Sequence, residues 1–583
     1  MALVRLDSTR CKVCWNGEPG FRCPVPRELL YQSFRSLQKV RSGPARKMLL
    51  PPCVAACPAN ICVQGYIGLI AAGLDEEAYR LIRSRVPFPR TLGWVCPHPC
   101  EAACIRGDYD QPIAINALKR FAAERVTPEL RGRVLDELRA EIAENGHKVA
   151  VIGAGPAGLT AAHDLRLRGY SVTVFDRLAK PGGLMLSGIP EYRLPRAVLE
   201  EELEEVLELG VTFRGKIQVG EDVPLEELLQ RYEAVFLAVG AQRGLRLGIP
   251  GEEAEGVVEG LRFLRGVNLG WERPHVGPRV VVIGGGDAAL DSARSALRLG
   301  GRKVAILYRR SRAELPAHHE QLEQAEAEGI ELLELVSPVR FVTDDGRLRG
   351  IELVRTELGE PDASGRRRPV PIPGSEFALE AETAIVAIGQ EMDPRPWQGL
   401  SLARASHGWI EVDDRMMTSV EKLFAGGDLV SGPATVIAAI AAGKRAAAGI
   451  DRYLRPKEAK KVCFYSPADA EREERYHPPE VPEERRVELP QAPAGERIAD
   501  FRPVELGLDE PAARAEARRC LACGLCANCN ACLDTFACPA LALTDDGQIA
   551  VDEVLCNGCG VCAQLCPNDA LVEAEVEEEK AVA

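Results

Sequence analysis

The sequence predicts a multidomain α/β protein in which two Rossmann-like nucleotide-binding domains lie between two cysteine-rich terminal modules. Three observations lead to this fold class. The chain has 583 residues, which at about 150 residues per domain suggests about four domains. Two glycine-rich turns, each directly after an apolar run, begin at Gly153 and Gly284. Of the 20 cysteines, nine precede residue 105 and ten lie between Cys520 and Cys566.

Composition and charge exclude several classes of protein. Lys plus Arg is 72 and Asp plus Glu is 86, which gives a formal charge of −14 and disfavours a general nucleic-acid binder. No run reaches about 18 apolar residues, so no membrane span is expected. The start, MALVRLDSTRCK, lacks the apolar segment of a signal peptide. We therefore expect a cytoplasmic protein with neither nucleic acid nor a membrane as its partner.

The distribution of the cysteines favours metal-bound thiolates over disulfides. A disulfide scaffold is short and has cysteines throughout. Here residues 105–519 contain a single cysteine, Cys463, and the other thiols are confined to the two ends of the chain. A reducing compartment with metal-bound thiols is the better interpretation.

The C-terminal module has the cysteine spacing of a bacterial ferredoxin. It contains Cys556-x-x-Cys559-x-x-Cys562-x-x-x-Cys566-Pro567, preceded by Cys526-x-x-Cys529-x-x-Cys532 and Cys538-Pro539. In such runs three neighbouring thiolates and one remote cysteine hold each [4Fe-4S] cluster. We assign one cluster to Cys526, Cys529, Cys532 and Cys566, and the other to Cys538, Cys556, Cys559 and Cys562. An α+β bacterial-type ferredoxin domain is therefore expected over residues 520–583.

Two alternatives remain for this module. Five residues rather than three separate Cys532 from Cys538, and the remaining Cys520 and Cys523 could shift the first register upstream. A zinc ribbon built from paired CxxC motifs is the second alternative. It does not need the repeated ferredoxin spacing, which is why we favour clusters.

The N-terminal module, residues 1–144, is expected to be helical and to hold clusters as well. Residues 64–92 read as helices with a turn at Pro87-Phe88-Pro89, and helical hairpins of this kind could present cysteines from their ends. The candidate ligands are Cys53, Cys57, Cys96, Cys100 and Cys104. Cys11 and Cys14, with Cys23, could complete a second cluster. A zinc site or structural thiols are the alternatives.

The first glycine turn has the full context of a dinucleotide-binding fingerprint. The strand KVAVIG leads into Gly153-x-Gly155-x-x-Gly158 and an apolar helix, and a second strand, SVTVFD, ends at Asp176. The glycines let the backbone approach a pyrophosphate at the helix N-terminus, and the acid can accept a hydrogen bond from a ribose hydroxyl.

The second glycine turn repeats this pattern with one difference. RVVVIG leads to Gly284-x-Gly286-x-x-Ala289, a helix and the strand KVAILY. That strand is followed by Arg309 and Arg310 rather than by an acid. Basic residues there suit a 2′-phosphate, so NADP(H) is favoured over NAD(H). The alternative is that these arginines form a solvated edge.

The order of the remaining segments predicts that one nucleotide-binding domain is inserted in the other. AVFLAVGA and AIVAIGQ are β-runs that each could close a sheet, and LFAGGD, ending at Asp428, precedes a long Ala-rich helix. Asp428 could meet the ribityl or pyrophosphate region of a flavin. The predicted domains are residues 145–250 with 390–455, residues 251–389, and a Pro- and charge-rich linker over 456–519.

These motifs resemble the glutamate synthase small-subunit family, which includes the large subunit of ferredoxin–NADP transhydrogenase and the N-terminal half of dihydropyrimidine dehydrogenase. The resemblance covers residues 50–455. It rests on the two fingerprints and on CPHPCEAAC, PIAINALKRFAAE, PGGLMLSGIPEYRLPR and YRRSRAELPA. It implies FAD at Gly153, Gly155, Gly158, Asp176 and Asp428, and NAD(P)H at Gly284, Gly286, Arg309 and Arg310.

The chain departs from the family pattern at two places. The CxxC motif usually found shortly before the position of Cys53 is missing. The helix after CPHPCEAAC often supplies a Glu or Gln ligand, but the corresponding residue here is Lys119. Cys62 could substitute as a ligand.

The resulting functional hypothesis is an NAD(P)H oxidoreductase that contains FAD and about three to four [4Fe-4S] clusters, two of them C-terminal. Hydride transfer between nicotinamide and flavin needs no side-chain acid–base pair, so we name no catalytic residue. The expected partner is a redox protein or complex subunit, such as ferredoxin, a sulfite reductase, or a 2-oxoacid or aldehyde oxidoreductase. The alternatives are a non-enzymatic electron-relay subunit and a bifurcating transhydrogenase subunit.

Overall fold

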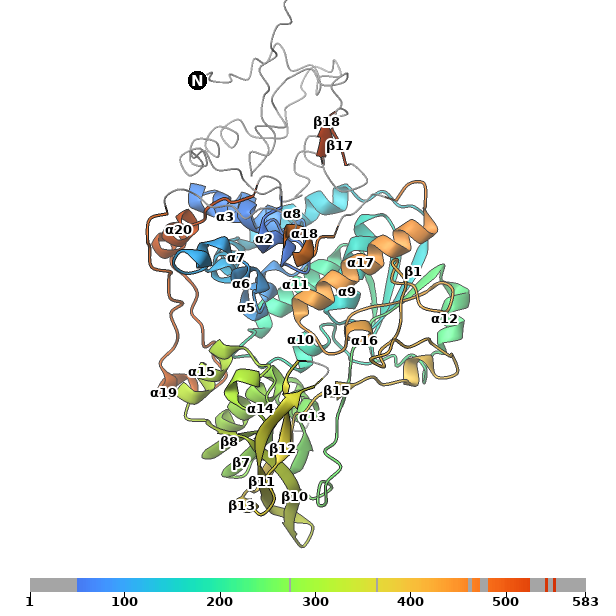
Figure 1. Cartoon of the computed structure of the whole chain (residues 1–583). Coiled ribbons are helices and arrows are strands. Elements are labelled where there is room, and N and C mark those ends of the chain that lie inside the picture. Colours follow the sequence, from blue (N-terminus) through green and yellow to red (C-terminus); the bar gives the residue numbers. More distant parts are fainter. Residues whose placement is uncertain are drawn as a thin grey trace, which may run out of the picture. The chain divides into compact units, whose positions relative to one another are not determined.

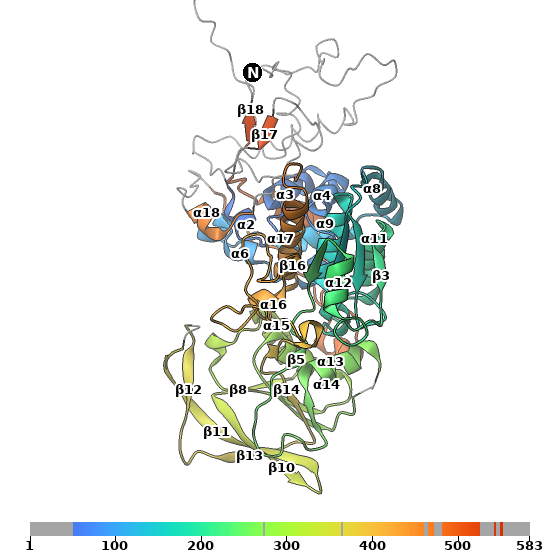
Figure 2. The ribbon, with the colours of Figure 1, turned by 90° about the vertical axis from the view of Figure 1, so that its right-hand side faces the viewer.

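The structure is a computed structural model that describes residues 50–271, 274–362, 365–459, 464–471, 481–524, 541–543 and 549–551. The chain forms two compact units, shown in Figure 1 and, turned by 90°, in Figure 2. Unit 1 comprises residues 1–134, 460–489 and 507–583, and unit 2 comprises residues 135–459 and 490–506. Within the described ranges, no helix is long and apolar enough to span a membrane.

Within its described residues unit 1 is mainly helical, as predicted for the N-terminal module. Its N-terminal part consists of α2 (Pro52–Ala55), α3 (Val63–Ala72), α4 (Asp75–Arg83), α5 (Pro89–Val95), α6 (Pro99–Ala102), η1 (Ile105–Asp108), α7 (Ile115–Glu124) and the start of α8 (Pro128–Ala140). Between α4 and α5 the chain is not helical, and the predicted Pro-Phe-Pro turn lies there. Proline disfavours helical backbone in the residue before it. The short helices deliver the cysteine side chains from their ends.

The C-terminal part of unit 1 packs on these helices. It contributes α18 (Pro467–Glu471) and α20 (Glu510–Arg518), and α20 lies against α3 and α7. The Arg514 guanidinium contacts the Asp75 carboxylate, with Nη2 and Oδ2 2.6 Å apart, and donates to the Ile70 carbonyl oxygen at 2.7 Å. Residues separated by more than 400 positions in the sequence are thereby joined in one unit.

The first sheet of unit 2 is parallel and has the order β16-β4-β1-β2-β3. Its strands are β1 (Lys148–Ile152), β2 (Ser171–Phe175), β3 (Thr212–Arg214), β4 (Ala234–Leu237) and β16 (Leu423–Ala425). β1 and β4 are almost wholly buried. Helix α9 (Pro156–Leu167) lies beside α17 (Val436–Leu454) in both views. The other helices here are α10 (Leu184–Ser187), α11 (Arg196–Glu208), α12 (Leu225–Arg231) and α16 (Asp428–Ser431).

The second sheet of unit 2 has the order β6-β14-β7-β8-β9 and is also parallel. Its strands are β6 (Val257–Glu259), β7 (Arg279–Ile283), β8 (Lys303–Tyr308), β9 (Glu331–Glu334) and β14 (Thr383–Val386). The accompanying helices are α13 (Gly260–Leu269), α14 (Asp287–Arg298), η2 (Arg312–Glu314) and α15 (His319–Ala327). An antiparallel sheet of β10 (Val336–Asp344), β11 (Arg347–Pro361), β12 (Arg367–Pro371) and β13 (Phe377–Glu380) interrupts the chain before β14.

The chain path agrees with the predicted closing strands. β4 lies between β16 and β1, and β14 lies between β6 and β7, so each of the two β-runs joins a different sheet. Where the chain passes between the two sheets, β5 (Arg243–Gly244) pairs with β15 (Gln390–Glu391). The second sheet is therefore built from residues that lie between β4 and β16 in the sequence. The domain boundaries themselves stay a prediction.

Of the predicted C-terminal module, residues 520–583, the structure describes residues 520–524 and two short strands. The strands are β17 (Leu541–Leu543) and β18 (Ile549–Val551), which pair antiparallel. The segment predicted to be a linker, residues 456–519, contains α18 and α20 and, among its described residues, the further short helix α19 (Ala494–Arg497). The short helix η3 (Arg395–Trp397) lies upstream of it, after β15. The eight predicted ferredoxin ligands, and Cys11, Cys14 and Cys23, lie outside the described residues.

Contact between α9 and α17 depends on Gly443. A Cβ atom at this position would lie 2.2 Å from the Ala157 carbonyl oxygen, and such overpacking costs about 1–3 kcal/mol. We predict that Gly443→Ala lowers the apparent Tm measured by far-UV circular dichroism. In the matched control, Gly132→Ala in α8, the new Cβ has nothing within 4 Å, and alanine's helix propensity should leave the Tm unchanged or slightly raised. An unchanged Tm for Gly443→Ala would contradict this packing.

Candidate functional site

The first glycine turn brings strand and helix together at the carboxyl end of β1. Gly153 has a φ of 105°, and a Cβ atom there would lie 2.4 Å from the Ala238 carbonyl oxygen. A Cβ on Gly158, in the first turn of α9, would lie 1.9 Å from the Gly153 carbonyl oxygen. Gly155 is the N-cap residue of α9. The three glycines leave the backbone at the helix N-terminus open to a phosphate group.

Asp176 is held in a pocket beside this turn. Its Oδ2 accepts from the Ala154 amide and its Oδ1 from the Leu178 amide, each at 2.7 Å. Burial raises the pKa of this carboxyl. The pocket is also lined by Gly153 and Gly183. Each carboxylate oxygen keeps a lone pair for a ribose hydroxyl. A glycine-lined turn with a fixed acid beside it fits the adenosine end of FAD.

Basic and amide side chains that the sequence motifs did not indicate also gather at this pocket. Arg265 and Arg177 both donate to the Gln242 side-chain oxygen, at 2.6 Å and 3.0 Å. Burial, with the nearby Arg177 charge, lowers the pKa of Arg265 to about 10. Gln242 and Arg177 line the pocket. Two guanidinium groups converge here, which favours an anionic ligand. Only their hydrogen bonds to Gln242, which sequence spacing does not encode, identify them.

Asp428 lies at the same edge of the sheet as the glycine turn. It follows β16 directly, and the parallel order β16-β4-β1 places the ends of these strands together. Its Oδ1 accepts from the Ala434 amide at 3.2 Å, and burial raises its pKa to about 6. A Cβ on Gly427 would lie 3.2 Å from the Ala157 side chain in α9. The residue before Asp428 thus lies against the start of α9, and the flavin-binding role of Asp428 stays a prediction.

The second glycine turn repeats the geometry of the first. Gly284 has a φ of 144°, and a Cβ atom there would lie 2.2 Å from the Ala387 carbonyl oxygen. Gly286 is the N-cap residue of α14, and Ala289 is fully buried in the first turn of that helix. A second dinucleotide therefore fits at the carboxyl edge of the second parallel sheet.

The two arginines after β8 have different surroundings. Arg309 is exposed at the end of the strand. Arg310 is buried, with Nη2 2.5 Å from the Asp362 carboxylate and Nε donating to the Arg367 carbonyl oxygen at 2.6 Å. The charge of Arg310 is therefore already balanced, and this side chain ties β8 to the neighbouring antiparallel sheet.

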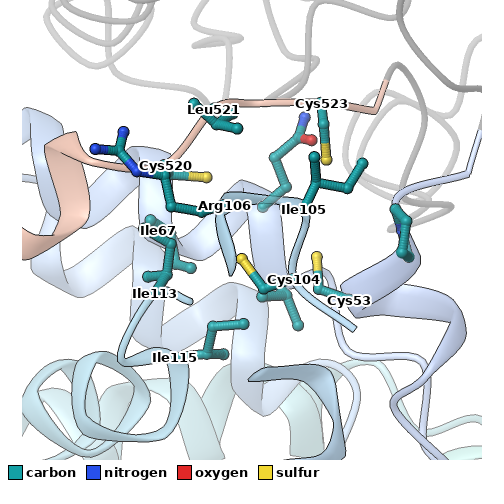
Figure 3. A pocket seen from close by; sticks show the side chains of 13 residues that line it. Cys53, Ile67, Cys104, Ile105, Arg106, Ile113, Ile115, Cys520, Leu521 and Cys523 are labelled. Carbon is teal, nitrogen blue, oxygen red and sulfur yellow. The ribbon is translucent and has the colours of Figure 1, made fainter. Parts of the chain in front are cut away.

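In unit 1 the predicted N-terminal cysteines separate into two groups. The first contains Cys53 and Cys104, which line a small apolar pocket together with two cysteines from the C-terminal part of the unit, Cys520 and Cys523 (Figure 3). Burial raises the pKa of the Cys53 thiol well above its usual value, and the nearby Cys523, Cys104 and Cys520 raise it further.

The second group contains Cys57, Cys96 and Cys100. Burial raises the pKa of Cys100 well above its usual value, as do Cys57 and Cys96, whereas the nearby Lys119 ammonium lowers it. Lys119 is 4% exposed. The three thiols fit three corners of a [4Fe-4S] cluster, and the residue at the usual fourth position is a cation with no lone pair to donate. Across the described part of the chain, no three His, Cys, Asp or Glu residues are close enough to hold a single metal ion.

Comparison with known proteins agrees with both units. The family model described as pyridine nucleotide-disulphide oxidoreductase matches residues 147–443. The small chain of NADPH glutamate synthase from Escherichia coli is 36% identical over 427 residues, which are 69% of this chain and 89% of that protein. The chain belongs to this oxidoreductase family and to its glutamate synthase small-subunit-like branch. Models for dihydropyrimidine dehydrogenase domain II with its 4Fe-4S cluster and for a 4Fe-4S binding domain match residues 46–129 and 549–572 of this oxidoreductase.

Two larger relatives match more of the oxidoreductase. The beta subunit of NADP(+)-dependent formate dehydrogenase from Moorella thermoacetica is 43% identical over 505 residues, 81% of this chain and 70% of that protein. The beta subunit of NADPH-Fe(3+) oxidoreductase from Geobacter sulfurreducens is 39% identical over 437 residues, 70% of this chain. The match spans 64% of that protein's length.

The raised pKa of Asp428 predicts a pH effect on the stability of the FAD-free protein. Its pKa of about 6 when folded exceeds the unfolded value of about 4. The folded state therefore binds the proton more tightly, and stability is lost as pH rises between these values. From about pH 5 to about pH 7.5 the loss from this group is about 1 kcal/mol. Asp428→Asn should remove this loss in urea unfolding measured at both pH values. Identical pH dependence in both proteins would contradict it.

Proposed function

We propose that this oxidoreductase moves electrons between NADP(H), FAD and a chain of [4Fe-4S] clusters, as the electron-input or electron-output subunit of a larger cytoplasmic redox complex. One observation carries the proposal. Unit 2 has two separate glycine turns that fit dinucleotides, and unit 1 has two groups of buried or half-buried thiols. A hydride donor, a flavin and one-electron carriers are the combination that uses all of these features.

In this proposal FAD occupies the first glycine turn and NADP(H) the second. Gly153, Gly155 and Gly158 place the pyrophosphate of FAD at the N-terminus of α9, while Asp176 and Asp428 hold its ribose and ribityl parts. Gly284, Gly286 and Ala289 do the same for NADP(H) at α14. When bound, the flavin supplies the exchange between a two-electron hydride donor and one-electron clusters. The chain binds and orients the two dinucleotides and contributes no proton-transfer residue.

The clusters are proposed to number about three to four, with two in the C-terminal ferredoxin module. Cys526, Cys529, Cys532 and Cys566 would hold one of those two, and Cys538, Cys556, Cys559 and Cys562 the other. The partner is proposed to be a catalytic subunit that exchanges single electrons with this module. The names of the Moorella and Geobacter relatives add two candidates for this partner, a formate-oxidising subunit and an Fe(3+)-reducing subunit. The earlier candidates are ferredoxin, a sulfite reductase, and a 2-oxoacid or aldehyde oxidoreductase.

Anaerobic reduction of the flavin tests the enzyme proposal against a role as a simple electron relay. We expect NADPH, added to the full chain with a full complement of FAD, to bleach the flavin absorbance within a stopped-flow experiment, and to do so faster than NADH. The reason is that both dinucleotide turns are intact in one unit. Protein with full FAD whose flavin is bleached by neither NADPH nor NADH would overturn the proposal.

Arg309 is proposed to contact the 2′-phosphate, because it follows β8 and its side chain is exposed, whereas Arg310 is bound to Asp362. A hydrogen bond to a charged group contributes about 1.5–3 kcal/mol. Arg309→Ala should therefore raise the KM for NADPH about 10- to 100-fold and leave the KM for NADH unchanged.

The matched control is Arg312→Ala, which removes a nearby exposed arginine that pairs with Glu326. It should change neither KM by more than about twofold, because such exposed ion pairs contribute little. Equal effects of the two substitutions, or an equal change for NADPH and NADH, would contradict the role of Arg309.

A further inference from the structure

Four cysteines from two distant parts of the chain surround one pocket in unit 1. Cys53 comes from α2 and Cys104 from the residue before η1, while Cys520 and Cys523 follow α20. In Figure 3 their four sulfur atoms are turned toward one another across the pocket. Apart from the cysteines the lining is mainly apolar, with Ile67, Ile105, Ile113 and Ile115 among it. An apolar lining with four converging thiols is the environment of an iron–sulfur cluster rather than of a polar ligand.

The Cys520-x-x-Cys523 loop is fixed to the N-terminal helices by a paired hydrogen bond. The Gln64 side chain donates from Nε2 to the Gly524 carbonyl oxygen and accepts at Oε1 from the Gly524 amide, each at 2.8 Å. Gln64 is buried. A Cβ atom on Gly524 would lie 2.2 Å from Pro51, two residues before Cys53. Gly524 therefore allows the backbone next to Cys523 to lie directly against the start of α2.

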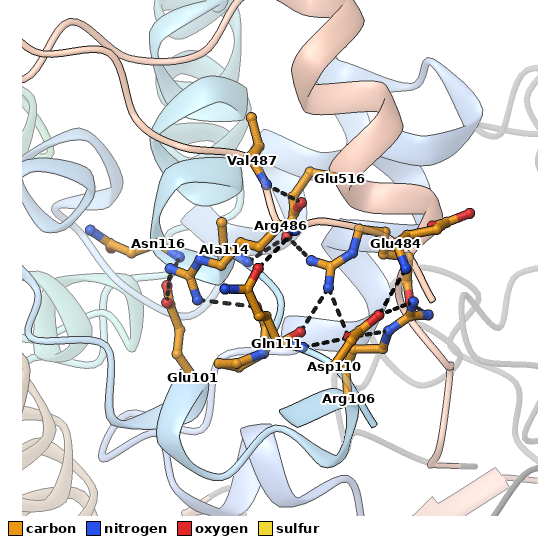
Figure 4. A network of polar contacts seen from close by, with 12 residues as sticks. Glu101, Arg106, Asp110, Gln111, Ala114, Asn116, Glu484, Arg486, Val487 and Glu516 are labelled. Atoms are coloured by element: carbon orange, nitrogen blue, oxygen red, sulfur yellow. Dashed lines mark hydrogen bonds and ion pairs between the residues drawn. The ribbon is translucent and has the colours of Figure 1, made fainter. Parts of the chain in front are cut away.

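A buried network of charges fixes the other end of the same loop (Figure 4). Arg519 precedes Cys520, and its guanidinium binds Glu516 at 2.8 Å and Asp110 at 3.0 Å. Arg106 binds Asp110 at 2.5 Å and donates to the Arg519 carbonyl oxygen at 3.1 Å. Glu516 also accepts from the Ala114 amide at 2.8 Å. Arg106, Glu516 and Arg519 are each 3% exposed or less. The segment just after Cys104 and the residue just before Cys520 are thereby joined.

The backbone between the two C-terminal cysteines has the conformation of a tight ligand loop. Ala522 has a φ of 46°, in the left-handed region that non-glycine residues rarely adopt. Asn60 and His98, with φ of 47° and 41°, occupy the corresponding loops beside Cys57 and between Cys96 and Cys100. Strained residues of this kind persist where the surrounding structure enforces them, and they concentrate at functional sites. Three of the described loops beside cysteines thus share the feature.

We propose that Cys53, Cys104, Cys520 and Cys523 together hold one [4Fe-4S] cluster, which joins the start of the C-terminal module to the N-terminal helical region. This assignment rests on the proposed function, in that it requires the chain to carry clusters. Each thiol loses its proton as its sulfur binds one iron, so four protons leave and no electron is transferred. The Cys520-x-x-Cys523 motif then takes the place of the CxxC motif that is missing before Cys53. It also removes these two cysteines from the ferredoxin register.

The test compares iron and acid-labile sulfide per FAD in the full chain, reconstituted anaerobically. Three variants are needed: Cys520→Ala with Cys523→Ala, Cys53→Ala with Cys104→Ala, and the combination of all four substitutions. Because one cluster needs all four thiols, each pair should lose about four irons, and the combination should also lose about four. The same signal should disappear from the low-temperature EPR spectrum of all three dithionite-reduced variants. Cys463→Ala, which removes the one cysteine outside the two cysteine-rich ends of the chain, is the control and should lose none.

Three results would overturn the assignment: loss of about eight irons in the combined variant, full iron in the Cys520→Ala, Cys523→Ala variant, or an equal loss of iron in Cys463→Ala. Flavin bleaching by NADPH in each variant shows that unit 2 is intact. If the wild-type protein itself shows no bleaching or contains no iron, the proposed function is refuted rather than this ligand assignment. A short bifunctional thiol reagent, added to wild-type protein after iron chelation, tests the geometry without any substitution. Mass spectrometry should find the peptide of Cys520–Cys523 linked to that of Cys53 or Cys104, and linkage only to the ferredoxin cysteines would contradict the site.

Discussion

The cost of burying thiolates governs the architecture of unit 1. Burial raises the pKa of Cys53, Cys57, Cys100 and Cys104, so in a protein without metal these groups are neutral thiols. A charged sulfur at such depth needs a compensating positive centre within bonding distance. Bound iron would supply that charge. It would explain why short helices end at cysteines, why strained loops lie beside them and why apolar side chains surround them.

Long-range polar contacts make this arrangement possible. The cluster site in unit 1 draws on segments more than 400 residues apart, and short-range preferences cannot bring them together. The Arg519, Glu516, Asp110 and Arg106 network, with the paired hydrogen bond between Gln64 and Gly524, does so. A buried network of this kind tolerates few substitutions, because each removed partner leaves another charge without compensation. Folding of unit 1 and assembly of its cluster are therefore expected to be coupled.

The sequence predicted well what local geometry determines. Both glycine turns, the strand that ends at Asp176 and the two closing β-runs were predictable because a strand–turn–helix motif is written in consecutive residues. The helical character of the N-terminal region was predictable for the same reason. Contacts between residues that are far apart in the sequence were missed. Arg310 looked available from its position after β8, but Asp362, 52 residues later, binds it. Arg177 and Arg265 both bind Gln242, although no common motif links the three residues.

The cysteines illustrate the same limit. Spacing selected Cys53, Cys57, Cys96, Cys100 and Cys104 as ligands but could not divide them, and the structure separates Cys53 and Cys104 from the other three. Cys520 and Cys523 were left without a role, because the partner of a CxxC motif can lie anywhere in the chain. The missing motif before Cys53 was the one signal that a substitute had to exist.

The central claim is that electrons pass between the clusters and NADP(H) through FAD in this one chain. Its most direct test starts from protein reduced with dithionite and freed of excess reductant under anaerobic conditions. After NADP⁺ is added, NADPH formation and the loss of cluster EPR signals are measured together, in holoprotein and in protein stripped of FAD. The account predicts about one NADPH for every two electrons lost by the clusters and flavin, in the FAD-containing protein only. Clusters that stay reduced in the presence of NADP⁺, or that are oxidised equally well without FAD, would contradict it.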